Sequence, residues 1–340
     1  MKIVIAPDSF KECMSSRQVA AAIATAVKQR WPQAQVVELP LADGGEGTLD
    51  ILAEALDARI VTASVHDPLG RLVRARYAIA GETAIVEVAQ AVGLSLLKPQ
   101  ERNPLTASSQ GLGELLLAAY ENGARHYIIG LGGTATCEGG AGMLALKGIE
   151  ALQAASFELL CDVDAPFVGP RGAARVFAPQ KGATPEEVEI LESNMRKQAA
   201  ALQKATGADV SNLPGAGAAG GLAGALMACF GARICSGIDR VLELVRFQDA
   251  IQDANLIITG EGKSDAQTLM GKVPMGVLQH SHGIPVALLS GCIEDRPALE
   301  QAGFKFVIEV SPRSLSLSDS LNPQNASKNL MQAVLTLPIA

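Results

Sequence analysis

Several features are rare or missing in this 340-residue sequence. There is no run of five basic residues, and the net charge of −7 argues against nucleic-acid binding, which depends on Lys and Arg contacts to phosphates. Aromatic residues make up only 4% of the chain, so we expect an aliphatic core. The six cysteines form no Cys-x-x-Cys pair and have no clustered His partners, which favours free thiols in a reducing cytoplasm over disulfides or zinc.

Long apolar runs are scarce as well. Residues 215–232 are uncharged, but they contain six glycines at spacings that suit close helix packing, so we do not expect a membrane span. The apolar run at the N-terminus stops at Pro7-Asp8, which is too early for a signal peptide. We therefore expect a buried first strand and a cytoplasmic protein.

The length predicts two domains, because single cores stop growing near about 250–300 residues. Helix and strand signals alternate at both ends of the chain, whereas 60–65, 72–79 and 83–88 read as strands with only turns between them. We expect an α/β fold in which a second, mixed α/β domain is inserted into a Rossmann-like domain with a parallel sheet. The expected boundaries are 1–60, 100–149 and 241–340 for the Rossmann-like domain, and 61–99 and 150–240 for the inserted one.

Local signals place some elements. Ser15-x-x-Gln18 and Thr184-Pro-Glu-Glu187 are typical of capping boxes that begin helices. Asp67-Pro-Leu-Gly70 has the residue preferences of a type I turn. The stretches FELLCDV and AARVFA, within 157–178, look like strands.

Two glycine motifs offer weak nucleotide signals. Gly262-Lys263-Ser264 matches the second half of a P-loop, but Ile257 replaces its first glycine. GLGGTA, at 130–135, fits a dinucleotide fingerprint with Glu150 about 20 residues further on. Either match can arise by chance in a chain with 34 glycines. An NAD-dependent dehydrogenase that uses GLGGTA stays an alternative, as does a non-enzymatic small-anion-binding protein.

A stronger signal is that several loops at strand ends share one composition. They combine glycine with lysines and carboxylates, in the stretches PDSFK (7–11), LADGGEG (41–47), GGT (132–134) and GEGKSD (260–265). Phosphoryl transfer needs this mixture, because cations and N–H groups bind phosphates while carboxylates bind Mg²⁺ or the acceptor hydroxyl. The acidic LADGGEG loop therefore suits metal-bridged phosphates. The plainer interpretation is that Asp43 caps the helix that follows.

Two further stretches are ambiguous. Asp162 and Asp164 would lie on one face of a strand and could bind a metal or act as a base, but they could equally begin a turn before Pro166. Lys181, in a QKGA turn, could reach a phosphate or lie in solvent. The four histidines show no catalytic spacing.

Seven segments, in order and over almost the whole chain, resemble the bacterial glycerate kinase family of the glycerate 2-kinase type. They are IAPDSFK, LADGGEGT, LGGTAT-x-x-GGAGM, CDVD-x-P, PQKGA, PGAGAAGG and ITGEGKSDAQTLMGK. The resemblance implies a kinase that uses ATP and Mg²⁺ to phosphorylate D-glycerate, at the 2-hydroxyl, in a cleft between two domains. It implies small-molecule partners, no nucleic acid, no membrane, and a monomer or homodimer.

The resemblance also implies site residues. Four are expected to be catalytic, and the aspartates among them to bind the metal: Lys11, Asp43, Asp162 and Asp164. Twelve are expected to bind substrate or phosphate: Asp8, Ser9, Glu46, Gly132, Gly133, Thr134, Lys181, Glu261, Lys263, Asp265, Gln267 and Lys272. The chain departs from the family at Glu12, at Cys137-Glu138, and between Gly148 and Cys161, where it is shorter by about 30 residues, a change that surface loops tolerate.

Overall fold

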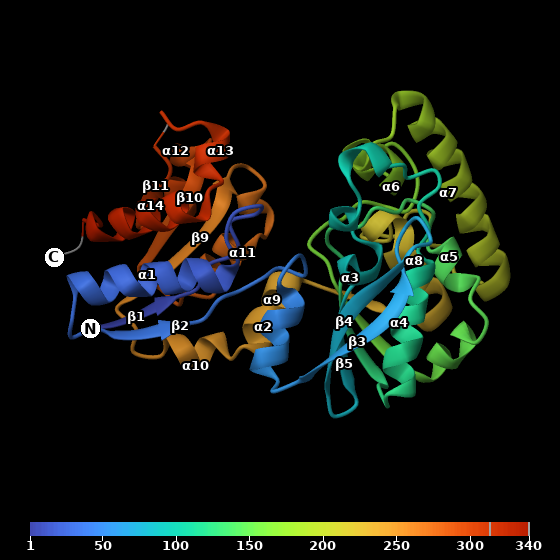
Figure 1. Ribbon diagram of the computed structural model, residues 1–340, viewed down its shortest axis with the longest axis horizontal. Coiled ribbons are helices and arrows are strands. Elements are labelled where there is room, and N and C mark those ends of the chain that lie inside the picture. The colour runs from blue at the N-terminus through green and yellow to red at the C-terminus, as the bar shows by residue number, and fades with distance from the viewer. Residues whose placement is uncertain (313, 339–340) are drawn as a thin grey trace. The chain divides into compact units, whose positions relative to one another are not determined.

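The computed structural model describes residues 1–312 and 314–338, which fold into two compact units (Figure 1). Unit 1 consists of Met1–Asp43 and Ile238–Ala340, and unit 2 consists of Gly44–Gly237. Each unit has its own β-sheet. The predicted α/β class, with one parallel sheet and one mixed sheet, is confirmed.

The sheet of unit 1 is parallel throughout the described residues. Its spatial order is β11-β10-β9-β1-β2. The strands are β1 Lys2–Ile5, β2 Gln35–Glu38, β9 Leu256–Ser264, β10 Val286–Ile293 and β11 Phe306–Glu309. The helices are α1 Ser16–Arg30, α9 Gly237–Leu244, α10 Phe247–Ile251, α11 Val273–Gln279, α12 Arg296–Ala302, α13 Leu317–Ser320 and α14 Pro323–Leu335, with a 3-10 turn η6 at Thr268–Met270.

Both faces of this sheet are covered, as its uninterrupted apolar strands require. Ile5 and its partner Ile258 pack in one cluster with α1 and α14, which lie side by side (Figure 1). Val4 and Ile257, which alternate with them, are also fully buried. α1 begins as predicted, because Ser15 and Gln18 form a reciprocal capping box.

The sheet of unit 2 has the spatial order β3-β4-β5-β6-β7-β8 in the described chain. The strands are β3 Arg59–His66, β4 Leu72–Ala80, β5 Thr83–Glu87, β6 His126–Gly130, β7 Ser156–Leu160 and β8 Arg233–Cys235. The first three form the predicted antiparallel meander, and β5 to β8 run parallel. The helices are α2 Thr48–Ala55, α3 Ala89–Val92, α4 Gln110–Glu121, α5 Ala141–Leu144, α6 Ala173–Phe177, α7 Pro185–Thr206 and α8 Leu222–Phe230, and the 3-10 turns are η1 Leu94–Leu96, η2 Pro99–Glu101, η3 Ile149–Ala154, η4 Pro179–Lys181 and η5 Ala218–Gly221.

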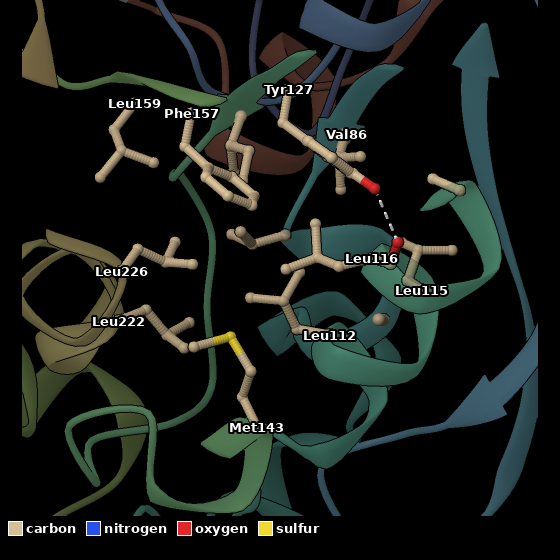
Figure 2. Packing of buried hydrophobic residues seen from close by; sticks show 14 of the residues in the cluster. Val86, Leu112, Leu115, Leu116, Tyr127, Met143, Phe157, Leu159, Leu222 and Leu226 are labelled. Carbon is tan, nitrogen blue, oxygen red and sulfur yellow. Dashed lines mark hydrogen bonds between the residues drawn. The ribbon is translucent and has the colours of Figure 1, made fainter. Parts of the chain in front are cut away.

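The core of unit 2 lies between this sheet and the helices α4 and α8 (Figure 2). Leu112 and Leu116 of α4 and Leu222 of α8 pack beneath the rings of Tyr127 and Phe157, whose centroids are 4.8 Å apart. The Tyr127 hydroxyl donates a hydrogen bond to the Leu116 carbonyl oxygen over 3.0 Å. This polar contact fixes how α4 lies on β6.

The expected domain boundaries differ from the two units. Residues 100–149 were assigned to the Rossmann-like domain, but β6 pairs with β5 and β7 of unit 2. Residues 44–60 also belong to unit 2, where α2 packs on β4 and β5. Alternation of helices and strands predicts parallel pairing, but it does not say which of two sheets a strand joins.

One local expectation is wrong, and another agrees with the structure. AARVFA is helical in α6, because its alanines and arginine favour helix and the stretch is too short for its periodicity to decide. The glycine-rich stretch 215–232 forms η5 and the nine-residue α8. Among the described residues, no helix is both long and apolar enough to cross a membrane.

We predict that Tyr127→Phe destabilises unit 2 by about 1 kcal/mol, because the buried carbonyl of Leu116 loses its side-chain partner. The thermal midpoint should fall by about 2–4 °C, measured by circular dichroism. Tyr120→Phe is the control, because this half-buried ring keeps its stacking under the Arg125 guanidinium, 3.9 Å away. Equal midpoints for both variants would contradict the role given to the Tyr127 hydroxyl.

Candidate functional site

In unit 1, the loops that follow β1 and β9 meet at one edge of the sheet. The chain leaves β1 towards β2 on one side and leaves β9 towards β10 on the other, so a topological switch point lies between them. Ligands of open α/β sheets bind at such points, beyond the carboxyl ends of the strands. The N–H of Asp8 donates to the Gly260 carbonyl over 2.8 Å, which ties the first loop to β9.

A cavity of about 620 Å³ opens at this edge. Charged residues from the end of β9 and from the segments that follow β1 and β9 line one part of it, among them Asp8, Lys11, Glu261, Lys263 and Lys272. Apolar residues from the segment after β11 line another part: Pro312, Leu315, Leu317 and Leu321. The structure thus brings six predicted site residues to one cavity, the five charged ones and Ser9, together with an apolar wall that the sequence did not reveal.

Asp8 is a buried carboxylate in this cavity, only 6% exposed. Burial and the nearby charge of Asp43 raise its pKa from 3.8 to about 8, against a hydrogen bond from the Ser9 N–H and the charge of Lys11. Glu261 raises it further. A carboxyl group surrounded by other carboxylates suits a cation, which would restore the charged form.

Glu261 organises the loop that follows it. Its Oε1 accepts hydrogen bonds from the hydroxyls of Ser264, over 2.9 Å, and Thr268, over 2.5 Å. The Lys272 ammonium lies 3.7 Å from Oε2. Burial raises the pKa of Glu261, and these partners oppose the shift. The buried carboxylate of Glu261 therefore fixes the positions of Ser264, Thr268 and Lys272, which follow it in the chain.

The other predicted residues of this motif form an ion-pair network. Lys263 lies 2.8 Å from Glu294 and 3.6 Å from Asp265, and Lys272 lies 3.9 Å from Asp265. The N–H of Gln267 donates to Asp265, and the Gln267 side chain is exposed. Because β9 continues through Ser264, the Gly-Lys-Ser sequence lies in a strand, which is not the geometry of a P-loop.

In unit 2, the two glycine loops pack backbone against backbone. The N–H of Gly132 donates to the Gly44 carbonyl over 3.2 Å. A Cβ on Gly132 would stand 2.7 Å from the Gly45 Cα, and one on Gly44 would stand 2.8 Å from the Leu160 Cβ. Glycine is therefore needed here for close packing of the loops. Gly133, also in the third loop, has φ of +75°.

Lys181 lies inside unit 2, with 3% of its surface exposed. Its ammonium donates to the Thr134 hydroxyl over 3.0 Å and to the Thr136 carbonyl over 2.7 Å. Burial lowers the pKa of Lys181 to about 8, and the nearby Cys137 opposes this. Two predicted residues, Lys181 and Thr134, are thus in direct contact.

The predicted carboxylates of unit 2 are exposed. β7 ends at Leu160, so Asp162 and Asp164 lie in a loop and the expected strand face does not exist. Asp162 Oδ1 accepts from the Gly237 N–H over 2.8 Å, and Asp164 lies 3.6 Å from Arg171. Glu46 is exposed as well. Among the described residues, no three His, Cys, Asp or Glu side chains gather as a metal site.

Two acids that support these loops, the partly buried Glu138 and the buried Glu87, are not among the predicted site residues. Glu138 accepts hydrogen bonds from the Ser109 N–H over 2.8 Å, from the Ser109 hydroxyl, and from the Gly142 N–H over 3.0 Å. Glu87 accepts from the Leu49 N–H over 2.6 Å at the start of α2, and burial raises its pKa. Each acid caps a helix that is distant in sequence, so no local pattern could reveal it.

We predict that Asp8→Asn raises the stability of the ligand-free protein. Because the Asp8 pKa is raised, the folded protein keeps a proton that the unfolded chain releases between pH 3.8 and about 8, so stability falls as the pH rises through this window. The variant's gain in thermal midpoint should therefore be larger at about pH 8 than at about pH 5.

Asp67→Asn is the control of opposite sign. Burial opposes ionisation of Asp67, but hydrogen bonds from the Arg71 N–H and side chain outweigh it and lower the pKa. That stabilisation is fully present at both pH values, so this variant should melt lower at both. A gain for Asp8→Asn that does not grow with pH would refute the assigned titration.

The sequence matches the model of the glycerate kinase family over residues 3–155 and 149–337. The two matches meet in the segment between Gly148 and Cys161 that was expected to be shortened. The chain is 41% identical to a Bacillus subtilis (strain 168) protein named glycerate kinase, covering 94% of this chain and 93% of that one. It is 40% identical to an Escherichia coli (strain K12) protein named glycerate 2-kinase, covering 91% and 90%.

A solved crystal structure of a Salmonella typhimurium LT2 protein assigned as glycerate kinase 2 is also similar. The TM-score is 0.82 at 40% sequence identity, and the match covers 98% of this chain and 96% of that chain. The family match, the sequence identities and the similarity of fold agree. The chain therefore belongs to the glycerate kinase family, as its seven motifs predicted.

Proposed function

We propose that this protein transfers the γ-phosphoryl group of ATP to the 2-hydroxyl of D-glycerate, giving ADP and 2-phosphoglycerate. The observation that carries the proposal is the cavity of unit 1, where buried Asp8 and Glu261 lie among lysines at the switch point of a parallel sheet. Phosphoryl transfer depends on this combination of anion-binding cations and carboxylates. Membership of the family and the name of the Escherichia coli relative support the same reaction and the 2-position.

The lysines of the cavity would neutralise the phosphates. Lys11 and Lys263 are exposed at its mouth, and Lys272 is partly exposed. Lys181 has another role in this proposal, because its ammonium is buried against Thr134 and Thr136. It would hold the GGT loop, with Gly132, Gly133 and Thr134, in the shape that contacts substrate.

A Mg²⁺ ion fits the acidic part of unit 1. Asp8 has its pKa raised by burial and by Asp43, and a divalent cation would remove that penalty. Mg²⁺ in kinases is held by one or two carboxylates together with phosphates, and it neutralises charge on the transferred group. Asp43 and Asp8 would hold it, with Ser9 and Asp265 orienting the neighbouring loops.

Residues of unit 2 would bind the acceptor. Asp162 and Asp164 are exposed carboxylates at the end of β7, and Glu46 is exposed at the start of α2. One of the two aspartates would accept the proton of the glycerate 2-hydroxyl. The oxygen of that hydroxyl would bond to the γ-phosphorus of ATP, while the bond from the γ-phosphorus to the β-phosphate oxygen breaks and ADP leaves. In unit 1, Gln267 and Glu261 would help to hold the segment that binds ATP, the phosphoryl donor.

The dehydrogenase alternative loses its structural basis. The N–H of Gly132 already bonds to Gly44, and the helix after the loop, α5, has only four residues. Glu150 lies exposed in η3 rather than at the end of a neighbouring strand, where a ribose hydroxyl would need it.

All six cysteines are free, which supports the proposed cytoplasmic location.

We predict that the purified protein releases ADP from Mg·ATP only when D-glycerate is present. The ³¹P NMR signal of the product should be a doublet, because phosphate on the 2-carbon couples to a single proton, whereas a 3-phosphate would give a triplet. NADH fluorescence should not change on adding the protein. Absence of turnover with folded protein would refute the kinase, and a triplet would refute the position.

Asp43→Asn and Asp162→Asn separate catalysis from binding. We expect each to lower kcat by at least about 100-fold, the scale on which general bases and metal ligands act. Asp249→Asn is the control, because this exposed carboxylate pairs with Arg246 on the surface of unit 1. If both site variants turn over as fast as the control, the roles proposed for these aspartates fail.

A further inference from the structure

The apolar wall of the unit 1 cavity has no role in binding phosphate or Mg²⁺. It consists of Pro312, Leu315, Leu317 and Leu321, and Leu317 is 76% exposed. A large apolar side chain held open to solvent beside a charged cavity points to an apolar group of a ligand. The ligand must therefore carry both an apolar part and an anionic part.

The wall is held in place by the protein itself. The N–H groups of Val310 and Ser311 donate to the carbonyls of Ser290 and Gly291, so the segment after β11 continues along β10. At its far end, the Cys13 thiol contacts the Ser320 carbonyl at 3.9 Å. One end of the wall is thus tied to β10, and the other end is tied to the segment after β1 that carries Asp8 and Lys11.

Two glycines, Gly262 and Gly291, form a floor that connects the apolar wall of the cavity to its charged residues. A Cβ on Gly291 would stand 2.5 Å from the carbonyl oxygen of Gly262, so β9 and β10 approach closely at these two positions, near the carboxyl ends of both strands. Both glycines line the cavity. The floor therefore has no side chains at these two positions, which suits a flat group lying against the backbone.

The volume of the cavity indicates which of the two proposed substrates, ATP or D-glycerate, would bind there. A cavity of about 620 Å³ lies within the range of about 300–1,000 Å³ that holds ligands of drug size. D-glycerate is a three-carbon acid without an apolar group, so it would fill little of this space and would leave the wall uncovered. A nucleoside polyphosphate has a flat apolar base at one end and charged phosphates at the other.

We propose that the unit 1 cavity is the adenine-nucleotide site, with the base against Leu315, Leu317 and Leu321 and the phosphates towards Lys11, Lys263 and Lys272. This inference rests on the proposed kinase function and deepens it. It assigns the donor nucleotide wholly to unit 1, through residues at the end of β9 and after β1, β9 and β11. The segment after β11, which carries none of the predicted site residues, becomes the base-binding element.

The first test separates base from phosphate. The double variant Leu315→Ser, Leu317→Ser should weaken binding of ADP by at least about tenfold, or 1.4 kcal/mol, in calorimetry without glycerate. Its affinity for tripolyphosphate should change less than about twofold. Lys272→Met should weaken both ligands. Met270→Ser is the matched control, because Met270 is also in unit 1 and is 78% exposed, but it does not line the cavity.

The second test uses a thiol inside the cavity. Cys292 is exposed and lines it, so bound ADP should slow its alkylation by iodoacetamide at least about fivefold, measured by peptide mass spectrometry. D-glycerate alone should not protect Cys292. Cys229, a partly buried thiol of unit 2, serves as the internal control, and its alkylation rate should not respond to ADP.

The outcomes distinguish this inference from the proposed function. Turnover of glycerate combined with unprotected Cys292 and unchanged ADP affinity in the double variant would overturn the nucleotide site and leave the kinase standing. Protection by glycerate rather than by ADP would also overturn it. Protection by ADP in a protein that never phosphorylates glycerate would refute the kinase and support the site.

Discussion

The parallel pairing of β1 with β9 is the contact on which the site of unit 1 depends. It joins strands from the two ends of the chain, and the hydrogen bond from Asp8 to Gly260 extends it into the loops. It thereby buries Asp8 within electrostatic reach of Glu261. Burying carboxylates together destabilises the ligand-free protein, and such an arrangement is typical of sites where a bound cation offsets the cost.

Unit 2 also buries a charged group at a predicted site, but there the group is a cation. Lys181 is buried and bonded to the GGT loop, so its ammonium lies where burial lowers its pKa. Gly132 of that loop packs against Gly44 and Gly45, which a phosphate cradle would not require. The glycines Gly44 and Gly45 of LADGGEG thus serve close packing, and its carboxylates, Asp43 and Glu46, are the groups that we propose for ligands.

Much of the local structure could be predicted, because its causes are local. The capping boxes at Ser15 and Thr184 and the turn at Asp67 form as expected, since each depends on residues within four positions. The charged residues at strand ends could be grouped because parallel strands end at one edge of a sheet. Five of them line one cavity for that reason. The apolar wall after β11 could not be found, because its position depends on tertiary contacts with Gly291 and Cys13.

The most direct measurement is a titration of the Asp8 carboxyl carbon by ¹³C NMR, assigned with the Asp8→Asn variant. We expect the Asp8 carboxyl to have a pKa far above 3.8, about 8, in the ligand-free protein, and we expect this pKa to fall strongly when Mg·ADP binds. An Asp8 pKa near 4 in the free protein, unchanged by the nucleotide, would contradict the claim that the sheet of unit 1 buries this carboxylate to receive a cation.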